Sequence, residues 1–160
     1  MRIIWLLLLI PVAMVARAFW FGRRNVMTLP EDHPEMANAI RGARETLAEF
    51  RRLVASPEQG MKHFGVKVRF GVEGGCEHCW VNELEVRDSG FVGKLGNQPN
   101  GNIGLQLGST VNVEDSAITD WSYSRDGVYQ GHFTTKVLLA HMPTRMRREV
   151  ETVYGWRKAA

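Results

Sequence analysis

The sequence predicts an α+β fold, with a curved antiparallel sheet of about five to six strands, an N-terminal amphipathic helix and a short C-terminal helix. Residues 36–54 carry apolar side chains at alternating steps of three and four, which is typical of a helix with one buried face. Residues 64–72 alternate apolar residues with polar residues or glycine, which predicts a strand with one buried face. Short turns separate the later apolar segments and therefore favour antiparallel pairing.

The N-terminal helix has a start signal and a stop signal. Asp32 followed by Glu35 forms a capping-box pattern at its beginning. Ser56 precedes Pro57, and a residue before proline avoids helical angles, so the helix should end by about residue 54. We expect one continuous helix over about 33–54. Its apolar stripe comprises Met36, Ile40, Ala43, Leu47, Phe50 and Val54.

The rest of the chain is predicted to form hairpins. After the strand at 64–72, a Gly-Gly turn leads to strands over about 80–87 and 91–95, and residues 96–101 form a loop. Shorter strands are expected at 111–113 and 118–123. Asp126-Gly127 is a strong signal for a two-residue hairpin. Residues 135–141 fit a strand or a helix, and residues 143–154 predict the terminal helix.

The first segment is predicted to lie outside the fold. Residues 3–16 are uncharged and largely apolar, shorter than the roughly 20 residues of a membrane span and typical of the core of a secretory signal. Ala16-Arg17-Ala18 supplies a cleavage pattern. We expect a signal peptide over 1–18, a linker over 19–31 and a single domain over 32–160. An uncleaved anchor over 3–21 is the main alternative, and a buried core helix is the third.

These expectations place the protein outside the cytoplasm, periplasmic or membrane-anchored, with membrane contact only through the N-terminal segment. The chain has 20 basic and 17 acidic residues. Cleavage after Ala18 removes Arg2 and Arg17 but no acid, which leaves 18 against 17 and a net charge of +1. Such a small excess does not predict nucleic-acid binding.

Cys76 and Cys79 flank Glu77 and His78 in the sequence, and this pattern is compatible with a metal site, a disulfide or a redox pair. A zinc site at Cys76, His78 and Cys79 has suitable ligand types. It would need a fourth ligand from one of the remaining histidines, His63, His132 or His141. Residues three apart in a strand have Cα atoms about 10 Å apart, whereas a disulfide needs about 7 Å or less, so a bond requires a turn over 76–79. We favour a disulfide or free thiols and expect no cofactor, with zinc as the alternative. A catalytic redox pair ranks below both, because such a pair lies at the start of a helix and no helical pattern follows Cys79.

Glu77, His78 and Asp120 are the candidate catalytic residues. Glu77 and His78 resemble an acid–base pair, and Asp120 is a candidate base. Adjacent residues of a strand face opposite sides, so a hydrolase built on these groups requires them to converge after folding. The chain has no G-x-S-x-G, phosphate-binding loop or HExxH motif. We therefore lean towards a non-catalytic domain and treat enzymatic activity as open.

Ordered motifs along the chain resemble the bacterial YegJ-like family, also called domain of unknown function 2314. The resemblance covers about residues 35–140 and depends on the order and spacing of several short motifs. They are Phe64-x-Val66-Lys67-Val68, Glu77-His78-x-Trp80-Val81, Phe91-x-Gly93, Asn97-x-Pro99, Gly108-x-x-Val111 and Ile118-x-Asp120-Trp121-x-Tyr123, after a helix carrying Ala43-Arg44-x-Thr46-Leu47-x-x-Phe50.

The resemblance implies an uncharacterised domain and no catalytic residue. The paired thiols depart from the family pattern, which argues against a family-wide role for them. The motif positions suggest Trp80, Asn97, Trp121 and Tyr123 as binding residues, although Trp121 and Tyr123 also fit a core. We expect a non-catalytic exported domain that binds an unknown protein or an envelope ligand.

Overall fold

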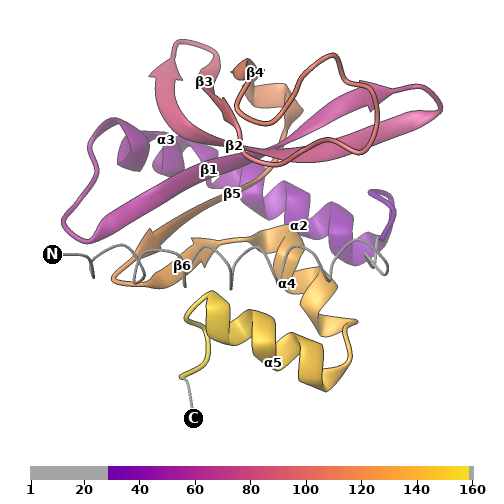
Figure 1. The fold of residues 1–160 in the computed structure, drawn as a ribbon. Helices are drawn as coiled ribbons and strands as arrows, with labels where there is room; N and C mark the ends of the chain where they lie inside the picture. The colour runs from indigo at the N-terminus through magenta and orange to yellow at the C-terminus, as the bar shows by residue number, and fades with distance from the viewer. Residues whose placement is uncertain (1–28, 159–160) are drawn as a thin grey trace, which may run out of the picture.

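The computed structural model describes residues 29–158 and confirms the α+β fold (Figure 1). The expected signal peptide and most of the expected linker lie outside the described residues. Six strands form one open antiparallel sheet in the order β4-β3-β2-β1-β5-β6. The strands are β1 (Met61–Val72), β2 (Gly75–Arg87), β3 (Gly90–Leu95), β4 (Thr110–Glu114), β5 (Ile118–Arg125) and β6 (Val128–Gly131).

Register shifts bend the two central strands. The extra residue lies in β1 between Lys62 and Gly65 and in β2 between Asn82 and Glu85. A third shift, opposite Lys67 and Val68, places the extra residue Thr119 in β5. An extra residue on one strand of a pair bends that strand and increases its twist. The long β1–β2 hairpin therefore curves across the molecule, as Figure 1 shows.

Helices cover one face of this sheet. They are α2 (Pro34–Glu45) and α3 (Leu47–Ala55), and they pack apolar side chains onto β1, β2, β3 and β5. Phe50 is fully buried, and its ring stacks on Trp121 with the centroids 5.0 Å apart. The buried side of the sheet is supplied by alternate strand residues such as Val66 and Val81. The core is therefore one layer between the helices and this face.

The chain ends in two short helices at the β6 edge, α4 (Phe133–Ala140) and α5 (Thr144–Val153). The segment that sequence patterns left open between strand and helix is thus helical. Asp126-Gly127 forms the predicted hairpin between β5 and β6. Within residues 29–158, no helix has the length and apolar character required to cross a membrane.

The structure corrects three expectations. The predicted capping box does not form, because the N-cap of α2 is His33 and no side chain makes a capping hydrogen bond there. The N-terminal helix is not continuous, because Thr46 leaves helical angles (φ −101°, ψ 4°) and separates α2 from α3. There the Trp121 indole donates to the Ala43 carbonyl at 3.0 Å and to Thr46 Oγ1 at 3.1 Å, so a tertiary contact occupies the last turn of α2. The second strand also begins earlier than expected, at Gly75, so residues 76–79 are extended and not a turn.

Candidate functional site

The face of the sheet away from α2 and α3 carries most of the polar chemistry. We call it the open face. Alternation along β1 and β2 places Lys67, Arg69, Cys76, His78 and Trp80 on it, because Lys67 pairs with Trp80 and Arg69 pairs with His78. Asp120 of β5 pairs with Lys67 and also belongs to this face.

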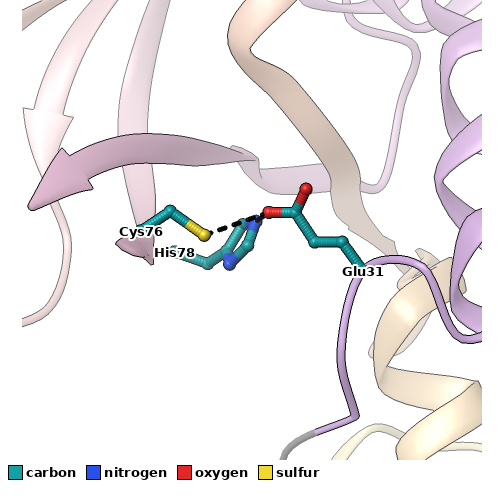
Figure 2. A group of neighbouring side chains, drawn as sticks. All are labelled: Glu31, Cys76 and His78. Carbon is teal, nitrogen blue, oxygen red and sulfur yellow. Dashed lines mark hydrogen bonds and ion pairs between the residues drawn. The ribbon is translucent and has the colours of Figure 1, made fainter. Parts of the chain in front are cut away.

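Glu31, Cys76 and His78 meet at one end of the open face (Figure 2). Their ligand atoms all lie within 4.8 Å of one another. Oε1 of Glu31 lies 3.2 Å from Cys76 Sγ and 3.0 Å from His78 Nε2. Glu31 lies in the segment that precedes α2. This segment contacts the part of β1 that follows Val68, the last β1 residue that pairs with β5. We call this group the Glu31 cluster.

Arg69 is the fourth member of the environment. Its Nε donates to the same Glu31 Oε1 at 2.9 Å. His78 Nε2 is buried and makes no well-directed hydrogen bond despite its closeness to Glu31. The carboxylate therefore receives a guanidinium and a thiol, while a buried imidazole nitrogen remains without a satisfactory partner.

The charges in the cluster shift its pKa values. Burial lowers the pKa of His78, although Glu31 opposes the shift. Burial alone would raise the pKa of Glu31, but hydrogen bonds from Cys76 and Arg69 outweigh it and lower that pKa. The hydrogen bond to Glu31, and then burial, raise the pKa of the Cys76 thiol. In the absence of another ligand the structure thus favours a neutral thiol, a neutral imidazole and an ionised Glu31.

Cys79 does not take part in this cluster. It lies on the buried face of β2 and is fully inaccessible, whereas Cys76 is partly exposed on the open face. Both cysteines are free. The structure therefore does not form the disulfide considered from sequence, nor the ligand set of Cys76, His78 and Cys79. The extended backbone is the reason, because residues 76 and 79 of a strand point in opposite directions.

A second polar group lies at the centre of the open face. Thr134 Oγ1 accepts from Lys67 Nζ at 3.0 Å and donates to Asp120 Oδ2 at 2.6 Å. Asp120 also accepts from the backbone N–H groups of Phe133 and Thr134, the first two residues of α4. Asp120 is fully buried and caps this helix from β5. Its role in the structure is to hold α4 against the sheet.

His132 lies between this group and the C-terminal segment, in an aromatic enclosure. Its ring centroid lies 4.5 Å from that of Tyr154 and 5.0 Å from that of Trp80. It is 4% exposed, and its Nε2 has no hydrogen-bond partner. Burial, with the charges of Lys67 and Lys136, lowers its pKa to about 3, so His132 is neutral at ordinary pH. It does not approach the Glu31 cluster closely enough to be a fourth ligand.

The three candidate catalytic residues do not converge. Glu77 points to the other face of β2, where its carboxylate accepts from the backbone N–H groups of Asn100 and Gly101. His78 is in the Glu31 cluster, and Asp120 is in the central group. Surface hollows lie between α4 and α5 and beside the β5–β6 turn, and neither is lined by any of these three residues. The structure therefore does not bring these residues into the single cleft that the hydrolase hypothesis required.

The four suggested binding residues also have structural roles. Trp121 and Tyr123 are buried in the core and stack on each other with centroids 6.0 Å apart. Asn97 accepts from the backbone N–H of Trp80 and fixes the loop after β3. Trp80 alone presents its side chain to the open face, where the Lys67 ammonium lies 5.6 Å from its ring centroid.

A comparison with known protein families identifies the family of this chain. Residues 33–157 match the family described as "Uncharacterized protein conserved in bacteria (DUF2314)". The chain belongs to this family. The match begins at α2 and continues to the C-terminal segment, so the DUF2314 domain includes the whole sheet and its helices. This confirms the YegJ-like resemblance.

Two curated relatives are similar to this DUF2314 chain. "Uncharacterized protein YegJ" of Escherichia coli (strain K12) is 26% identical over 112 residues, which cover 70% of this chain and 72% of the relative. "Putative ankyrin repeat protein NMB1133/NMB1171" of Neisseria meningitidis serogroup B is 28% identical over 116 residues, which cover 70% of this chain. The matched part spans 44% of that Neisseria protein. No solved structure matches the chain.

Sequence reasoning missed Glu31, Lys67 and the enclosure of His132. Glu31 belongs to the segment that the sequence predicts as a linker, 45 residues before the thiol it contacts. Lys67 alternates with valines like any exposed strand residue. Their importance follows from strand pairing and from the path of the segment before α2. Lys67 lies in the motif Phe64-x-Val66-Lys67-Val68, but that motif does not indicate its contact with Thr134.

Proposed function

We propose that the chain is a non-catalytic binding domain that works in the bacterial cell envelope. The observation that carries this proposal is the separation of Glu77, His78 and Asp120 into three different environments. Glu77 and Asp120 are occupied by backbone N–H groups of a loop and of a helix. A general acid or base needs access to substrate, whereas Asp120 is fully buried and the half-buried Glu77 has both carboxylate oxygens engaged by loop N–H groups.

The location in the envelope is supported by the N-terminal sequence. The uncharged segment over 3–16, followed by Ala16-Arg17-Ala18, has the order of features that a secretory signal requires. Cleavage after Ala18 releases the domain outside the cytoplasm, and an uncleaved anchor agrees with the proposal where it holds the domain on that same side.

The surface we propose for binding is the β1–β2 end of the open face. It combines charged, thiol and imidazole groups with partial exposure: the side chains of Arg69, His78 and Glu31 are 48%, 26% and 38% exposed. Gly71 pairs with Cys76 beside them, and a side chain added there would meet no atom within 4 Å. A partner protein or an envelope ligand can therefore approach this end without displacing a helix.

A photo-crosslinking experiment in the native host tests this proposal. A photoreactive amino acid is introduced at Gly71, with a matched control at Arg41, whose side chain is 67% exposed on α2. We expect a higher-mass adduct from position 71 in the envelope fraction and none from position 41. An absence of adduct at 71, or equal adducts at both positions, would contradict binding through the open face.

A further inference from the structure

We propose that Glu31, Cys76 and His78 form a binding site for one divalent transition-metal ion of the zinc class. The inference deepens the proposed function, since it names a ligand for the same end of the open face. It uses one oxygen, one sulfur and one nitrogen donor, from a segment and a strand that are distant in sequence.

The donor atoms are already close enough for a common ion. A tetrahedral zinc with ligand distances of about 2.0–2.3 Å holds its ligand atoms about 3.3–3.7 Å from one another. Oε1 of Glu31 lies 3.2 Å from the sulfur and 3.0 Å from the imidazole nitrogen, and all three atoms lie within 4.8 Å. Rotation of side chains, with no change in β2, is enough to seat an ion between them.

The kind of donors selects the ion. Thiolate and imidazole favour zinc and similar transition metals, whereas magnesium and calcium prefer sites made of oxygen alone. The buried Nε2 of His78 supports this interpretation, because it faces the cluster and makes no well-directed hydrogen bond there. On binding, the Cys76 thiol proton leaves to solvent and the sulfur donates its electron pair to the metal.

The backbone explains why Cys76 and His78 act together while Cys79 does not. Residues 76 and 78 are two apart in β2 and so share a face, and Arg69 pairs with His78 across the hairpin. Glu31 supplies the third donor from the segment before α2. Among residues 29–158, no fourth His, Cys, Asp or Glu joins this group. The fourth position is thus left to water or to a group from a partner, as in zinc sites that exchange ligands.

Arg69 competes with the metal for Glu31, and the carboxylate can satisfy both. Every Glu31 contact found within residues 29–158 uses Oε1, while Oε2 accepts no hydrogen bond there. Rotation of the carboxylate leaves one oxygen for Arg69 and the other for the ion. The guanidinium then orients the ligand oxygen, which is a common arrangement around metal ligands.

Metal titration of the purified full chain tests the site. The chain is reduced, stripped with a chelator and titrated with Zn²⁺ against a chromogenic competitor. Co²⁺ is then used as a spectroscopic substitute. We expect one ion per chain and a thiolate-to-cobalt charge-transfer band. Loss of an outer-shell partner lowers metal affinity about 10–100-fold, so Cys76→Ala, His78→Gln and Glu31→Gln should each lower it at least tenfold.

Matched controls separate ligation from damage to the fold. Cys79→Ala removes the other thiol, and His141→Gln removes an imidazole that contacts only Glu35 among the described carboxylates. Both should bind Zn²⁺ like wild type and retain the charge-transfer band. Circular dichroism confirms that each variant is folded. A wild-type chain that binds no Zn²⁺ above background, or a folded Cys76→Ala chain that binds as tightly as wild type, would overturn the metal site.

This result is independent of the envelope proposal. A chain without zinc that still crosslinks through position 71 would remove the metal inference and leave the binding domain. A chain that binds zinc through Cys76 but gives no specific adduct would support the metal site and contradict partner binding at the open face.

Discussion

At the residue scale, Asp120 shows how a group with catalytic chemistry becomes structural. It is fully buried and accepts hydrogen bonds from Thr134 Oγ1 and from three backbone N–H groups, of which two begin α4. Burial raises the pKa of Asp120, while the hydrogen bonds from Thr134 and the charge of Lys67 oppose the shift. Removing this side chain would leave several donors buried without an acceptor.

Asp120→Ala is therefore expected to lower the free energy of unfolding by about 3 kcal/mol, the magnitude for breaking a buried charged hydrogen-bond network. Urea unfolding measures the change. Glu85→Ala is the control, since its ion pair with Arg87 is exposed and should contribute less than about 1 kcal/mol. Equal midpoints for Asp120→Ala and wild type would show that Asp120 does not anchor α4.

His132 makes stability depend on pH. The pKa of His132 is about 3 in the folded chain, against an ordinary value of 6.5, so below pH 6.5 the unfolded chain binds a proton that the folded chain does not. The neutral residue contributes fully above pH 6.5, and that contribution is lost as pH falls towards 3. The slope from this residue is at most about 1.4 kcal/mol per pH unit.

His132→Asn should flatten this dependence. Asparagine tolerates the left-handed backbone angles found at this position (φ 53°) and does not titrate. Urea midpoints at pH 7, 6 and 5 should fall more steeply for wild type than for the variant. Parallel curves for the two proteins would contradict a neutral, enclosed His132. Asp120 and Lys67 are present in both proteins, so their titration does not contribute to the difference between the two curves.

At the element scale, Phe50 is the largest of the three buried side chains that hold α3 on the sheet, the others being Leu47 and Leu53. Phe50 is fully buried and contacts Trp121, Phe91 and Phe64, with ring centroids 5.0, 5.9 and 6.1 Å away. Phe50→Ala should destabilise the chain by about 3–5 kcal/mol, because it removes the burial and leaves a cavity. Thermal or urea unfolding tests this. Glu49→Ala, on the exposed side of the same helix, should stay within about 0.5 kcal/mol of wild type.

The loop between β3 and β4 depends on Glu77. The carboxylate accepts from the N–H groups of Asn100 and Gly101 at 2.6 and 2.7 Å. Glu77→Ala should speed amide exchange in residues 97–108, while exchange in β1 and β5 stays slow. Unchanged exchange in the loop would mean that Asn97 and the other loop contacts are enough to order it. Glu77 would then have no structural role in the loop.

Elements were predictable from sequence where local patterns decide them. The stripe through Phe50, the alternation through Val66 and the Asp126-Gly127 turn all have the predicted structure. The break at Thr46 was not predictable, because it depends on Trp121, 75 residues away in sequence. The Glu31 cluster depends on a contact across 45 residues. Local periodicity contains no information on such pairings.

At the scale of the whole molecule, the fold separates stability from exposed chemistry. Helices α2 and α3 bury one face of the sheet, and α5 lies on the far side of β6 and α4 (Figure 1). Tyr154 and Trp156 of the C-terminal segment pack against His132. What remains open is the β1–β2 end with Cys76, His78 and Arg69. A domain built in this way can present a binding site without exposing its core.

Alkylation of the two thiols tests whether the core and the exposed chemistry lie on opposite faces of the sheet. Cys76 is partly exposed and Cys79 is fully buried, so an alkylating reagent should modify Cys76 in the native chain and Cys79 only after unfolding. Bound metal should protect Cys76, and a chelator should restore its reactivity. Equal native reactivity of both cysteines would contradict the placement of Cys79 in the core.

The most direct test of the central claim is the intact mass of the protein isolated from fractions of its native host, with alkylation before and after unfolding. An exported binding domain predicts the mass of residues 19–160 in the periplasmic fraction, or the full-length mass in the membrane fraction. In both cases two thiols are alkylated after unfolding. A full-length chain confined to the cytosolic fraction would contradict export, and a mass lower by two protons without alkylation would contradict the free thiols on opposite faces of β2.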